Sequence, residues 1–339
     1  MINLLKYYAK KRIIIVGIIS TILLLLSLLM FQDGFVHGGP TGGHPINNPV
    51  QIIGVCSIIL SLIIPVFEFS FKMRKVGIDE FYKYPITRKK LFLTKYIVGL
   101  LEVIIPITSF WLFMLIRIVL SDHMFIMSYY FLYFIVLLGL IFIIYTIVTF
   151  IYSKCNTIYD GLICIALATF LTFVVGETIS TSLNNFDVCI YTNYDSWYCP
   201  HPNDYFIFSP IAFVSNTFRQ LMENYEGKLY SSEIQSLVIY STISVISFIL
   251  FIVLSDKEKA ENSMDISSSW FSYKTFIPIY IVYLSTDIGS EAIYIILIAI
   301  IGYIGYAIYR RSFKIKLCDI ITMSVCITIG FIIANISLH

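Results

Sequence analysis

The segment "KMRKVGIDEFYKYPITRKKLFLTK", residues 72–95, lies between two long apolar runs of the chain. It carries eight of the 23 Lys and Arg residues of the whole sequence, and it contains no recognisable catalytic constellation. Positive charge gathers in this way in the short cytoplasmic loops of membrane proteins. The segment therefore fixes the orientation of the apolar runs on either side of it, provided that those runs cross a membrane.

The composition of the chain indicates that these apolar runs do cross a membrane. The chain has 339 residues, of which 58% are hydrophobic and only 13% are charged, and its mean hydropathy is +0.85. A soluble domain of this length could not hide so much apolar surface from water. We therefore predict an all-α integral membrane protein, because helices satisfy their own backbone hydrogen bonds in lipid.

A helix needs about 20 mostly apolar residues to cross a hydrocarbon core about 30 Å thick. Eight apolar segments of the chain meet this length criterion. A ninth, residues 275–289, is shorter, and it is either a tilted span or a re-entrant segment. A cleaved signal peptide near the N-terminus is disfavoured, because the apolar run is too long and no small-x-small cleavage pattern follows it. The eight segments that meet the length criterion are residues 13–31, 50–67, 96–119, 125–150, 161–182, 234–254, 291–309 and 318–337.

The distribution of Lys and Arg decides whether residues 275–289 cross. With nine spans and a cytoplasmic N-terminus, the inside segments hold twenty of these residues and the outside segments hold only Arg219 and Lys228. If residues 275–289 did not cross, the four basic residues of segment 310–316 would lie outside, which breaks the pattern. We therefore predict a multi-pass protein of the cell membrane with nine spans and its C-terminus outside.

The sequence contains none of the common short motifs of catalysis. It has no G-x-x-x-x-G-K-[ST], no H-E-x-x-H, no G-x-S-x-G and no paired C-x-x-C. The five histidines include no pair at the helical i, i+4 spacing that metal ligands use. We expect a chain that is not an enzyme, binds no metal, cofactor or nucleic acid itself, and depends on a partner for any energy.

Three charged residues fall inside predicted spans, where ionised side chains are costly unless they are paired or hydrated. Glu102 lies about two turns from Lys95, and Arg117 lies at the outer end of the same span. Glu177 lies in the outer half of the fifth span, and it pairs with Arg117 if the two helices are neighbours. Both a structural ion pair and a place on a transport path are open for Glu102, Arg117 and Glu177.

Two of the seven cysteines, Cys189 and Cys199, fall in the predicted outside loop. An oxidising exterior permits a disulfide between them, which would contribute about 2–3 kcal/mol of stability. Two unpaired thiols are the alternative. The other five cysteines lie in or against spans, where Cys behaves as a small hydrophobic residue.

The opening segment also has local structure of its own. Residues 77–84, "GIDEFYKY", have acidic residues early, a basic residue later and aromatic residues at i, i+3, which is typical of a short surface helix. Pro85 ends this helix, because the residue before a proline is pushed out of the α region. Thr87 is well placed to cap a new helix that runs into the third span.

This pattern resembles that of a known transporter family. "DEFYKYPITRKKLF", residues 79–92, is similar to the acidic-aromatic helix and Pro-[hydrophobic]-[Ser/Thr]-Arg turn found after the second span in membrane subunits of type-2 ABC exporters, the ABC-2 permease superfamily. "FSPIAFVSN", residues 208–216, resembles the Ser-Pro stretch of the family's outside loop, where short helices re-enter the outer leaflet. "EKAENS" (258–263) and "RRSFKIK" (310–316) resemble cytoplasmic segments of a Gram-positive bacterial subgroup that includes acetoin and cell-wall-antibiotic-response transporters.

The resemblance implies a division of the chain and a set of partners. Residues 1–254 would form a six-span permease core with the coupling segment 68–95 and the outside loop 183–233, and residues 255–339 would add three spans. Two ATPase subunits would bind ATP and Mg, and a second permease, identical or related, would complete the exporter in the lipid membrane. Members of the subgroup often carry a large outside domain after the last span, and its functions are not carried over here.

The resemblance also implies which residues meet the ATPase and what the complex does. The substrate moved outward would be amphipathic: a peptide, an antibiotic or a lipid-like molecule. A membrane-embedded sensor or immunity protein that binds an antimicrobial peptide without pumping is the alternative. The docking residues would be Val76, Gly77, Ile78, Asp79, Glu80, Phe81, Tyr82, Tyr84, Pro85, Thr87 and Arg88, with Phe81 and Tyr82 as the anchors.

The charge distribution makes a testable prediction about topology. Single cysteines introduced as Asn262→Cys and Asn224→Cys in a cysteine-free chain should react with a membrane-impermeant maleimide from opposite faces. Position 262 should be labelled only from the cytoplasm and position 224 only from outside. Labelling of both positions from one face would contradict the nine-span arrangement.

Overall fold

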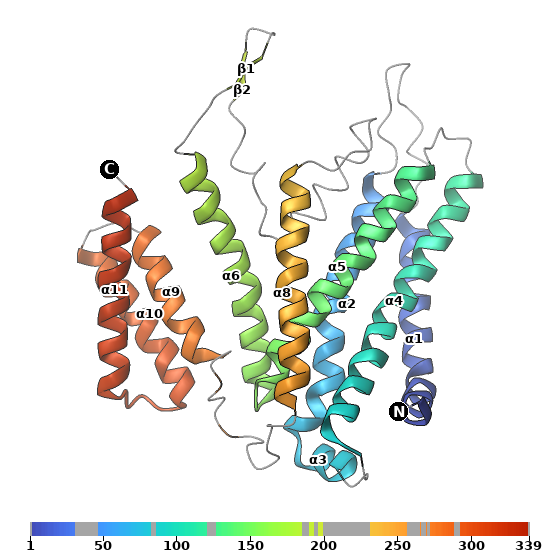
Figure 1. Cartoon of the computed structure of the whole chain (residues 1–339), viewed down its shortest axis with the longest axis horizontal. Coiled ribbons are helices and arrows are strands. Elements are labelled where there is room, and N and C mark those ends of the chain that lie inside the picture. Colours follow the sequence, from blue (N-terminus) through green and yellow to red (C-terminus); the bar gives the residue numbers. More distant parts are fainter. Residues whose placement is uncertain are drawn as a thin grey trace. The chain divides into compact units, whose positions relative to one another are not determined.

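The computed structural model describes residues 2–30, 47–82, 86–120, 127–184, 190–192, 196–198, 231–255, 265, 269, 272–287 and 292–337. Apart from one short hairpin, its regular elements are helices (Figure 1). A helix covers each of the nine apolar segments that the sequence predicts as candidate spans. The prediction of a helical membrane fold is confirmed at this level.

The lengths of the helices indicate how many of them can cross a membrane. Among the described residues, five helical stretches are long and apolar enough, and shorter apolar stretches lie at Ile158–Leu171, Tyr294–Arg310 and Leu317–Ile333. The chain is therefore a multi-pass membrane protein, and the number of nine spans stays a prediction. The five long stretches are Leu4–Leu28, Ile52–Met73, Arg88–Arg117, Tyr130–Ser153 and Leu237–Ser255.

The helices form two compact units. The first comprises Met1–Phe71, Val76–Phe150 and Ile207–Glu258, and the second comprises Lys72–Lys75, Ile151–Phe206 and Lys259–His339. This grouping places the helix at residues 158–184 with the C-terminal helices. The predicted division into a six-span core and three additional spans is a statement about membrane topology, and it stays a prediction.

The first unit is built around one long helix, α4 (Arg88–Leu120). α1 (Ile2–Met30), α2 (Asn47–Phe69) and α8 (Ser231–Ser255) pack against it, and most of α5 (Met127–Ser153) belongs to the same unit. On the outer surface of α1, Ile13 and Ile14 are 66% and 70% exposed. Such apolar surface is compatible with a lipid environment and not with water.

Aromatic side chains hold the core of this unit together. Phe69 of α2, Phe92 of α4 and Phe251 of α8 form a triangle with ring centroids 5.6–6.0 Å apart. One turn further along α4, Tyr96 lies 5.3 Å from the Tyr145 ring of α5, and the Tyr145 hydroxyl donates to the Tyr96 carbonyl. Each of these pairs adds to the burial of apolar area, so α4 is tied to three other helices near one end.

The predicted surface helix is present as α3 (Lys75–Tyr82), directly after a 3-10 turn, η1 (Ser70–Met73). Figure 1 shows α3 at the same end as α1's N-terminus. α4 begins at Arg88, and its first backbone hydrogen bond runs from the Leu91 amide to the Thr87 carbonyl, which places Thr87 at the predicted cap position. Tyr84 and Pro85 lie outside the described residues.

The second unit has α9 (Tyr273–Asp287) at its centre. α6 (Ile158–Asn184), α10 (Ala292–Arg310) and α11 (Leu317–Ser337) all pack against α9. α9 and α11 approach closely at Gly330, where an added Cβ would lie 2.3 Å from the Cβ of Ser285. Small residues at such a crossing let two membrane helices come into backbone contact. The buried core residues are Tyr273, Ile277, Ile281, Ile298, Tyr306, Tyr309 and Cys326.

The predicted outside loop contains a short antiparallel hairpin, β1 (Ile190–Thr192) and β2 (Ser196–Tyr198), in which Tyr191 is opposite Trp197. The sequence analysis does not anticipate these strands. The predicted re-entrant helices and the predicted Cys189–Cys199 disulfide lie outside the described residues. In the sequence, Cys189 directly precedes β1 and Cys199 directly follows β2.

The close contact between α3 and η1 leads to a second prediction. A Cβ at Gly77 would lie 2.4 Å from the carbonyl oxygen and 2.9 Å from the Cα of Phe71, and backbone atoms cannot move aside as a flexible side chain can. Gly77→Ala should therefore push α3 away from η1. The free energy of local opening of α3 should fall by roughly 1–3 kcal/mol, which increases amide hydrogen exchange in α3 about tenfold or more.

The matched control is Gly17→Ala in α1, where no atom lies within 4 Å of the added Cβ. This variant should leave exchange in α3 unchanged. Equal exchange in α3 for Gly77→Ala and the wild type would show that the two segments are not packed as described.

Candidate functional site

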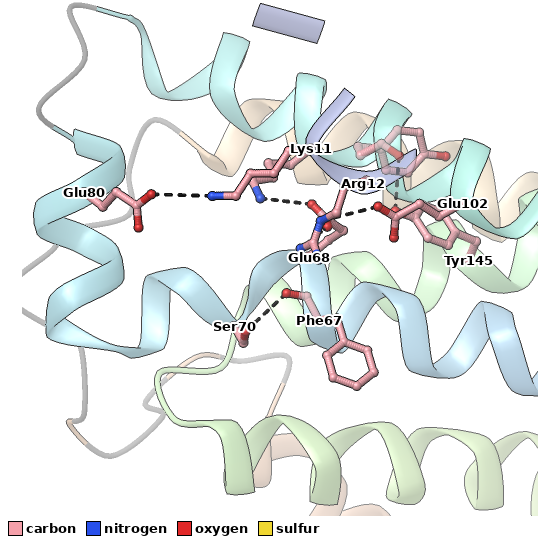
Figure 2. A network of polar contacts seen from close by, with 10 residues as sticks. Lys11, Arg12, Phe67, Glu68, Ser70, Glu80, Glu102 and Tyr145 are labelled. Carbon is pink, nitrogen blue, oxygen red and sulfur yellow. Dashed lines mark hydrogen bonds and ion pairs between the residues drawn. The ribbon is translucent and has the colours of Figure 1, made fainter. Parts of the chain in front are cut away.

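Four charged side chains from three helices meet in the first unit. Arg12 comes from α1, Glu68 from α2, and Lys95 and Glu102 from α4; together they are called the charge cluster. The Lys95 Nζ lies 3.0 Å from Glu68 Oε2, and the Arg12 guanidinium contacts the other Glu68 oxygen. Arg12 Nε also lies 3.5 Å from Glu102 Oε1, which makes an ion pair without a hydrogen bond. Figure 2 shows Arg12 between the two carboxylates.

The charge cluster is buried and electrically balanced. The residues Glu68, Lys95 and Glu102 are only 1%, 3% and 2% exposed, so three of the four charges have almost no contact with the surroundings of the protein. An isolated charge in such a place would be strongly destabilising. Two positive and two negative groups cancel, and each carboxylate has a cation within ion-pair distance. Burial is therefore tolerated only while the four side chains stay together.

The positions of these residues along their helices explain why they meet. Lys95 and Glu102 are seven residues apart, which places them on one face of α4 about 10 Å apart along the axis. Glu68 lies in the last turn of α2, where the chain leaves the apolar run. Arg12 lies at the start of the apolar run of α1. The end of α2 and a position about three turns into α1 thus present opposite charges to the same face of α4.

Three aromatic rings enclose the Lys95 ammonium on its other side. Nζ lies 4.8 Å from the ring centre of Tyr8, 5.4 Å from that of Phe71 and 4.7 Å from that of Phe81. Contacts of a cation with ring faces at these distances are each worth about 0.5–2 kcal/mol, more when water is excluded. We call Tyr8, Phe71 and Phe81 the Lys95 cage.

The cage connects the surface helix α3 to the charge cluster. Phe81 belongs to α3, and its ring lies 4.7 Å from that of Phe71 and 5.9 Å from that of Tyr8. A second link joins Lys11 Nζ to Glu80 Oε1 at 3.8 Å, but both side chains are more than half exposed. A surface pair of this kind contributes little. The main connection from α3 to the spans is therefore the packing of Phe81 around Lys95.

Gly99 lets α4 pack closely against α5 and α2. A Cβ at this position would lie 2.2 Å from the Tyr145 hydroxyl and 3.1 Å from Glu68 Cγ. α4 therefore approaches α5 and α2 directly beside the charge cluster, and the Tyr145 hydroxyl donates to the Tyr96 carbonyl at 3.1 Å. Any larger residue at 99 would separate the helices that carry the cluster.

Of the two charged residues predicted inside spans whose side chains the structure describes, Glu102 belongs to this site and Arg117 does not. Arg117 lies in the last turn of α4, fifteen residues and about 22 Å along the helix from Glu102. The side chain of Glu177 lies outside the described part of the chain, so its pairing with Arg117 stays a prediction.

Sequence reasoning missed Arg12, Glu68 and Lys95 as site residues. Each lies within one residue of a predicted span boundary, at 13, 67 and 96 respectively; Arg12 and Lys95 were counted among the topological charges, and Glu68 was given no role. The helices continue past these boundaries, to Ile2 in α1, Phe69 in α2 and Arg88 in α4. The available signal was the lone acidic residue Glu68 beside a strongly basic segment.

The predicted docking residues divide into two groups in α3 and after it. Asp79, Glu80 and Thr87 are exposed, whereas Gly77, Ile78, Phe81 and Arg88 are half-buried. The side chains of Val76 and Tyr82 lie outside the described residues. Phe81 packs on Lys95 as part of the cage, so the exposed side chains that the structure describes in α3 are those of Asp79 and Glu80.

The chemistry of the site is that of a structural link. Within the part of the chain that the structure describes, no group of three or more His, Cys, Asp or Glu residues is arranged to hold a metal ion. The charge cluster joins α1, α2 and α4, and the cage extends this connection to α3. A displacement of α3 would therefore be transmitted to all three helices.

Comparisons of this chain with models of protein families, with curated proteins and with solved structures gave no match.

The burial of the charge cluster leads to a third prediction. Glu68→Gln leaves two cations with one carboxylate, so the free energy of unfolding in detergent micelles should fall by about 3 kcal/mol. Glu68→Gln combined with Lys95→Met removes one charge of each sign and should recover most of that loss. Glu80→Gln, which breaks only the exposed pair with Lys11, should change the stability by less than about 1 kcal/mol.

Unfolding followed by tryptophan fluorescence, to which Trp111, buried in α4, contributes, would measure these differences. Equal losses for Glu68→Gln and Glu80→Gln would contradict a buried, charge-balanced cluster.

Proposed function

We propose that this chain is the permease subunit of an ATP-driven exporter of the type-2 ABC class. The observation that carries the proposal is the Lys95 cage: Phe81 of the surface helix α3 and Tyr8 of α1 both lie within 5 Å of the same buried ammonium group. A short helix outside the spans that is packed into their ends is what a coupling element requires. Residues 79–92 resemble the family's coupling segment, and on that ground we propose that α3 binds an ATPase subunit.

The mechanism follows from the connections of the charge cluster. Two ATPase subunits, which hold ATP and Mg, would close on nucleotide binding and move α3. Because Phe81 packs on Lys95 and Lys95 pairs with Glu68, α4 and α2 would follow α3, and Arg12 would bring α1 with them. The inner ends of three helices would then move as one group, which changes the access to the permease from one side of the membrane to the other.

The proposal includes a topology and an assembly. The chain would cross the cell membrane of a Gram-positive bacterium nine times, with its N-terminus in the cytoplasm and its C-terminus outside. It would pair with a second permease, identical or related. The substrate moved outward would be amphipathic, as a peptide, an antibiotic or a lipid-like molecule is.

The structure changes which residues of α3 are proposed to face the ATPase. Phe81, expected from the sequence as an interface anchor, packs against Phe71 and Tyr8 within this chain. Asp79 and Glu80 are exposed. We therefore assign the docking contact to this acidic face, while Phe81 transmits the movement inward. Phe81→Ala would disturb both steps, so it does not test docking alone.

The fourth prediction separates docking from internal packing. Asp79→Arg combined with Glu80→Arg reverses the charge of the exposed face and leaves the cage residues unchanged. Tagged protein purified from its own host membranes should lose at least tenfold of the copurifying ATPase, because like charges placed in an interface disfavour association. Expression and orientation should be unchanged, since Lys and Arg added on the cytoplasmic side agree with the positive-inside rule.

The control is Lys89→Arg combined with Lys90→Arg, which keeps the charge of two exposed residues at the start of α4. It should retain the ATPase fully. Mass spectrometry of the copurifying proteins identifies the ATPase by its phosphate-binding motif. Full retention in the charge-reversed variant would refute the docking assignment. A wild type that binds a cationic antimicrobial peptide but no ATPase would instead support a sensor or immunity protein.

A further inference from the structure

The second unit contains an elongated apolar cavity that plays no part in the proposed coupling. It has a volume of about 250 Å³ and is partly open to its surroundings. Its lining comes from α6, α9 and α10, and includes Leu167, Ile277, Ile301, Gly302 and Gly305. An apolar cavity of about 150 Å³ already stays free of water and takes up a hydrocarbon such as benzene. This larger cavity is therefore a site for hydrocarbon.

The shape of the cavity suits an extended hydrocarbon chain and not a compact molecule. Its lining runs along α9 from Tyr273 to Leu284, a separation of eleven positions, which is about 16 Å of helix axis. α6 and α10 both pack on α9, and α9 forms the floor of the cavity between them. The lining residues Ile163, Ile301 and Ile308 are 38%, 49% and 51% exposed, so the opening is bordered by lipid-compatible surface.

Glycine keeps the cavity open along α10. At Gly305 the atoms nearest to an added Cβ would be Ile277 side-chain atoms at 3.5–3.7 Å, which is ordinary contact distance. The space beside Gly305 is therefore available, and a longer side chain there would extend into the cavity. This contrasts with Gly302, where an added Cβ would lie 2.7 Å from the Met323 sulfur.

Polar and basic groups gather at one end of the cavity. The hydroxyl of the lining residue Tyr273 donates to Asp160 Oδ1 at 3.2 Å, and Arg311 Nη2 lies 3.4 Å from Asp160 Oδ2. Arg311 has a left-handed backbone, with φ of 50°, and it ends α10 together with a hydrogen bond from the Ser312 amide to the Ala307 carbonyl. The Arg311 side chain is 48% exposed. A guanidinium is thus held at the end of the cavity with part of its surface open.

The turn after Arg311 has the character of a membrane interface. Lys314 and Lys316 are exposed, and Phe313 between the basic residues is 83% exposed. The Tyr303 hydroxyl donates to the Phe313 carbonyl at 2.9 Å, which holds this turn back against α10. Basic residues beside an exposed aromatic ring are suited to the headgroup level of a bilayer, where anionic lipids attract Lys and Arg.

We propose that the cavity between α6, α9 and α10 binds one acyl chain of an anionic phospholipid, whose phosphate contacts Arg311, Lys314 and Lys316. The charge of the turn matches a phosphate, and the cavity beside it matches the hydrocarbon that is covalently joined to that phosphate. The site is independent of the proposed coupling through α3, because it lies wholly within the second unit. The expected occupant is phosphatidylglycerol or a lipid of the same charge.

The fifth prediction uses the full chain in detergent, with phosphatidylglycerol and phosphatidylcholine of the same acyl chains as probes. Native mass spectrometry should show retention of phosphatidylglycerol at least tenfold above that of phosphatidylcholine. Lys314→Gln combined with Lys316→Gln should remove about tenfold of this preference, because each basic residue near the headgroup attracts the anionic lipid. Lys6→Gln combined with Lys10→Gln, which changes two exposed basic residues of α1, should preserve it.

A cavity-filling pair tests the acyl chain separately. Gly305→Leu should lower the retention of phosphatidylglycerol at least tenfold, whereas Gly139→Leu should not, since no atom lies within 4 Å of a Cβ added there. Circular dichroism and size-exclusion profiles show whether each variant is folded. Equal retention of the two lipids by the wild type, or equal effects of the two leucine variants, would overturn the proposal.

The wild-type chain offers a measurement that does not depend on folding of variants. Phosphatidylglycerol with a photoactivatable group in its acyl chain should label peptides of α6, α9 and α10. Labelling confined to α1, α5 or α8 would overturn the assignment. Retention of a free fatty acid as strong as that of the phospholipid would refute the headgroup contact.

Discussion

The ion pair between Lys95 and Glu68 is the constraint on which the first unit depends. The ammonium and the carboxylate are both buried, so their surroundings screen the two charges only weakly. A buried pair of this kind is a poor source of net stability, but separation of its partners is strongly unfavourable. Its structural effect is therefore to fix positions. As long as Lys95 stays buried on α4, Glu68 must stay beside it, and the C-terminal end of α2 cannot move alone.

The remaining members of the cluster extend this constraint. Glu102 adds a second buried carboxylate, and Arg12 lies between it and Glu68, so α1 is held to the same face of α4. The Lys95 ammonium also contacts the ring of Phe81, which connects α3 to the cluster. Close helix approach at Gly99 and close backbone contact at Gly77 make these connections rigid. A rigid group of helix ends with one surface helix attached is suited to receive force from a partner.

The second unit uses similar chemistry at the ends of its helices. Asp160, in the first turn of α6, accepts a hydrogen bond from Tyr273 of α9 and pairs with Arg311 after α10. Across the next turn, Arg310 forms a two-point contact with Asp319, with N–O distances of 2.8 and 2.9 Å. Because lipid supplies no hydrophobic driving force between helices, such polar contacts and close packing have to select their neighbours. The cavity beside Gly305 is a gap that this packing leaves partly open.

The sequence by itself determined the class of the protein and the approximate position of its helices. Apolar length is sufficient for that, because each membrane helix satisfies its backbone locally and needs no distant partner to be recognised. It also determined that a short surface helix lies here, predicted at residues 77–84 and present at 75–82, and that a new helix starts after Thr87, since proline and capping residues act within a few positions. It could not determine the charge cluster or the apolar cavity of the second unit. Arg12, Glu68 and Lys95 are separated by tens of residues and look like ordinary boundary charges, and only the packing of α1 and α2 on one face of α4 turns them into a buried network. The direction of Phe81 was decided in the same way: a helix pattern shows that one face is apolar, but only the tertiary structure shows that this face covers Lys95 inside the chain.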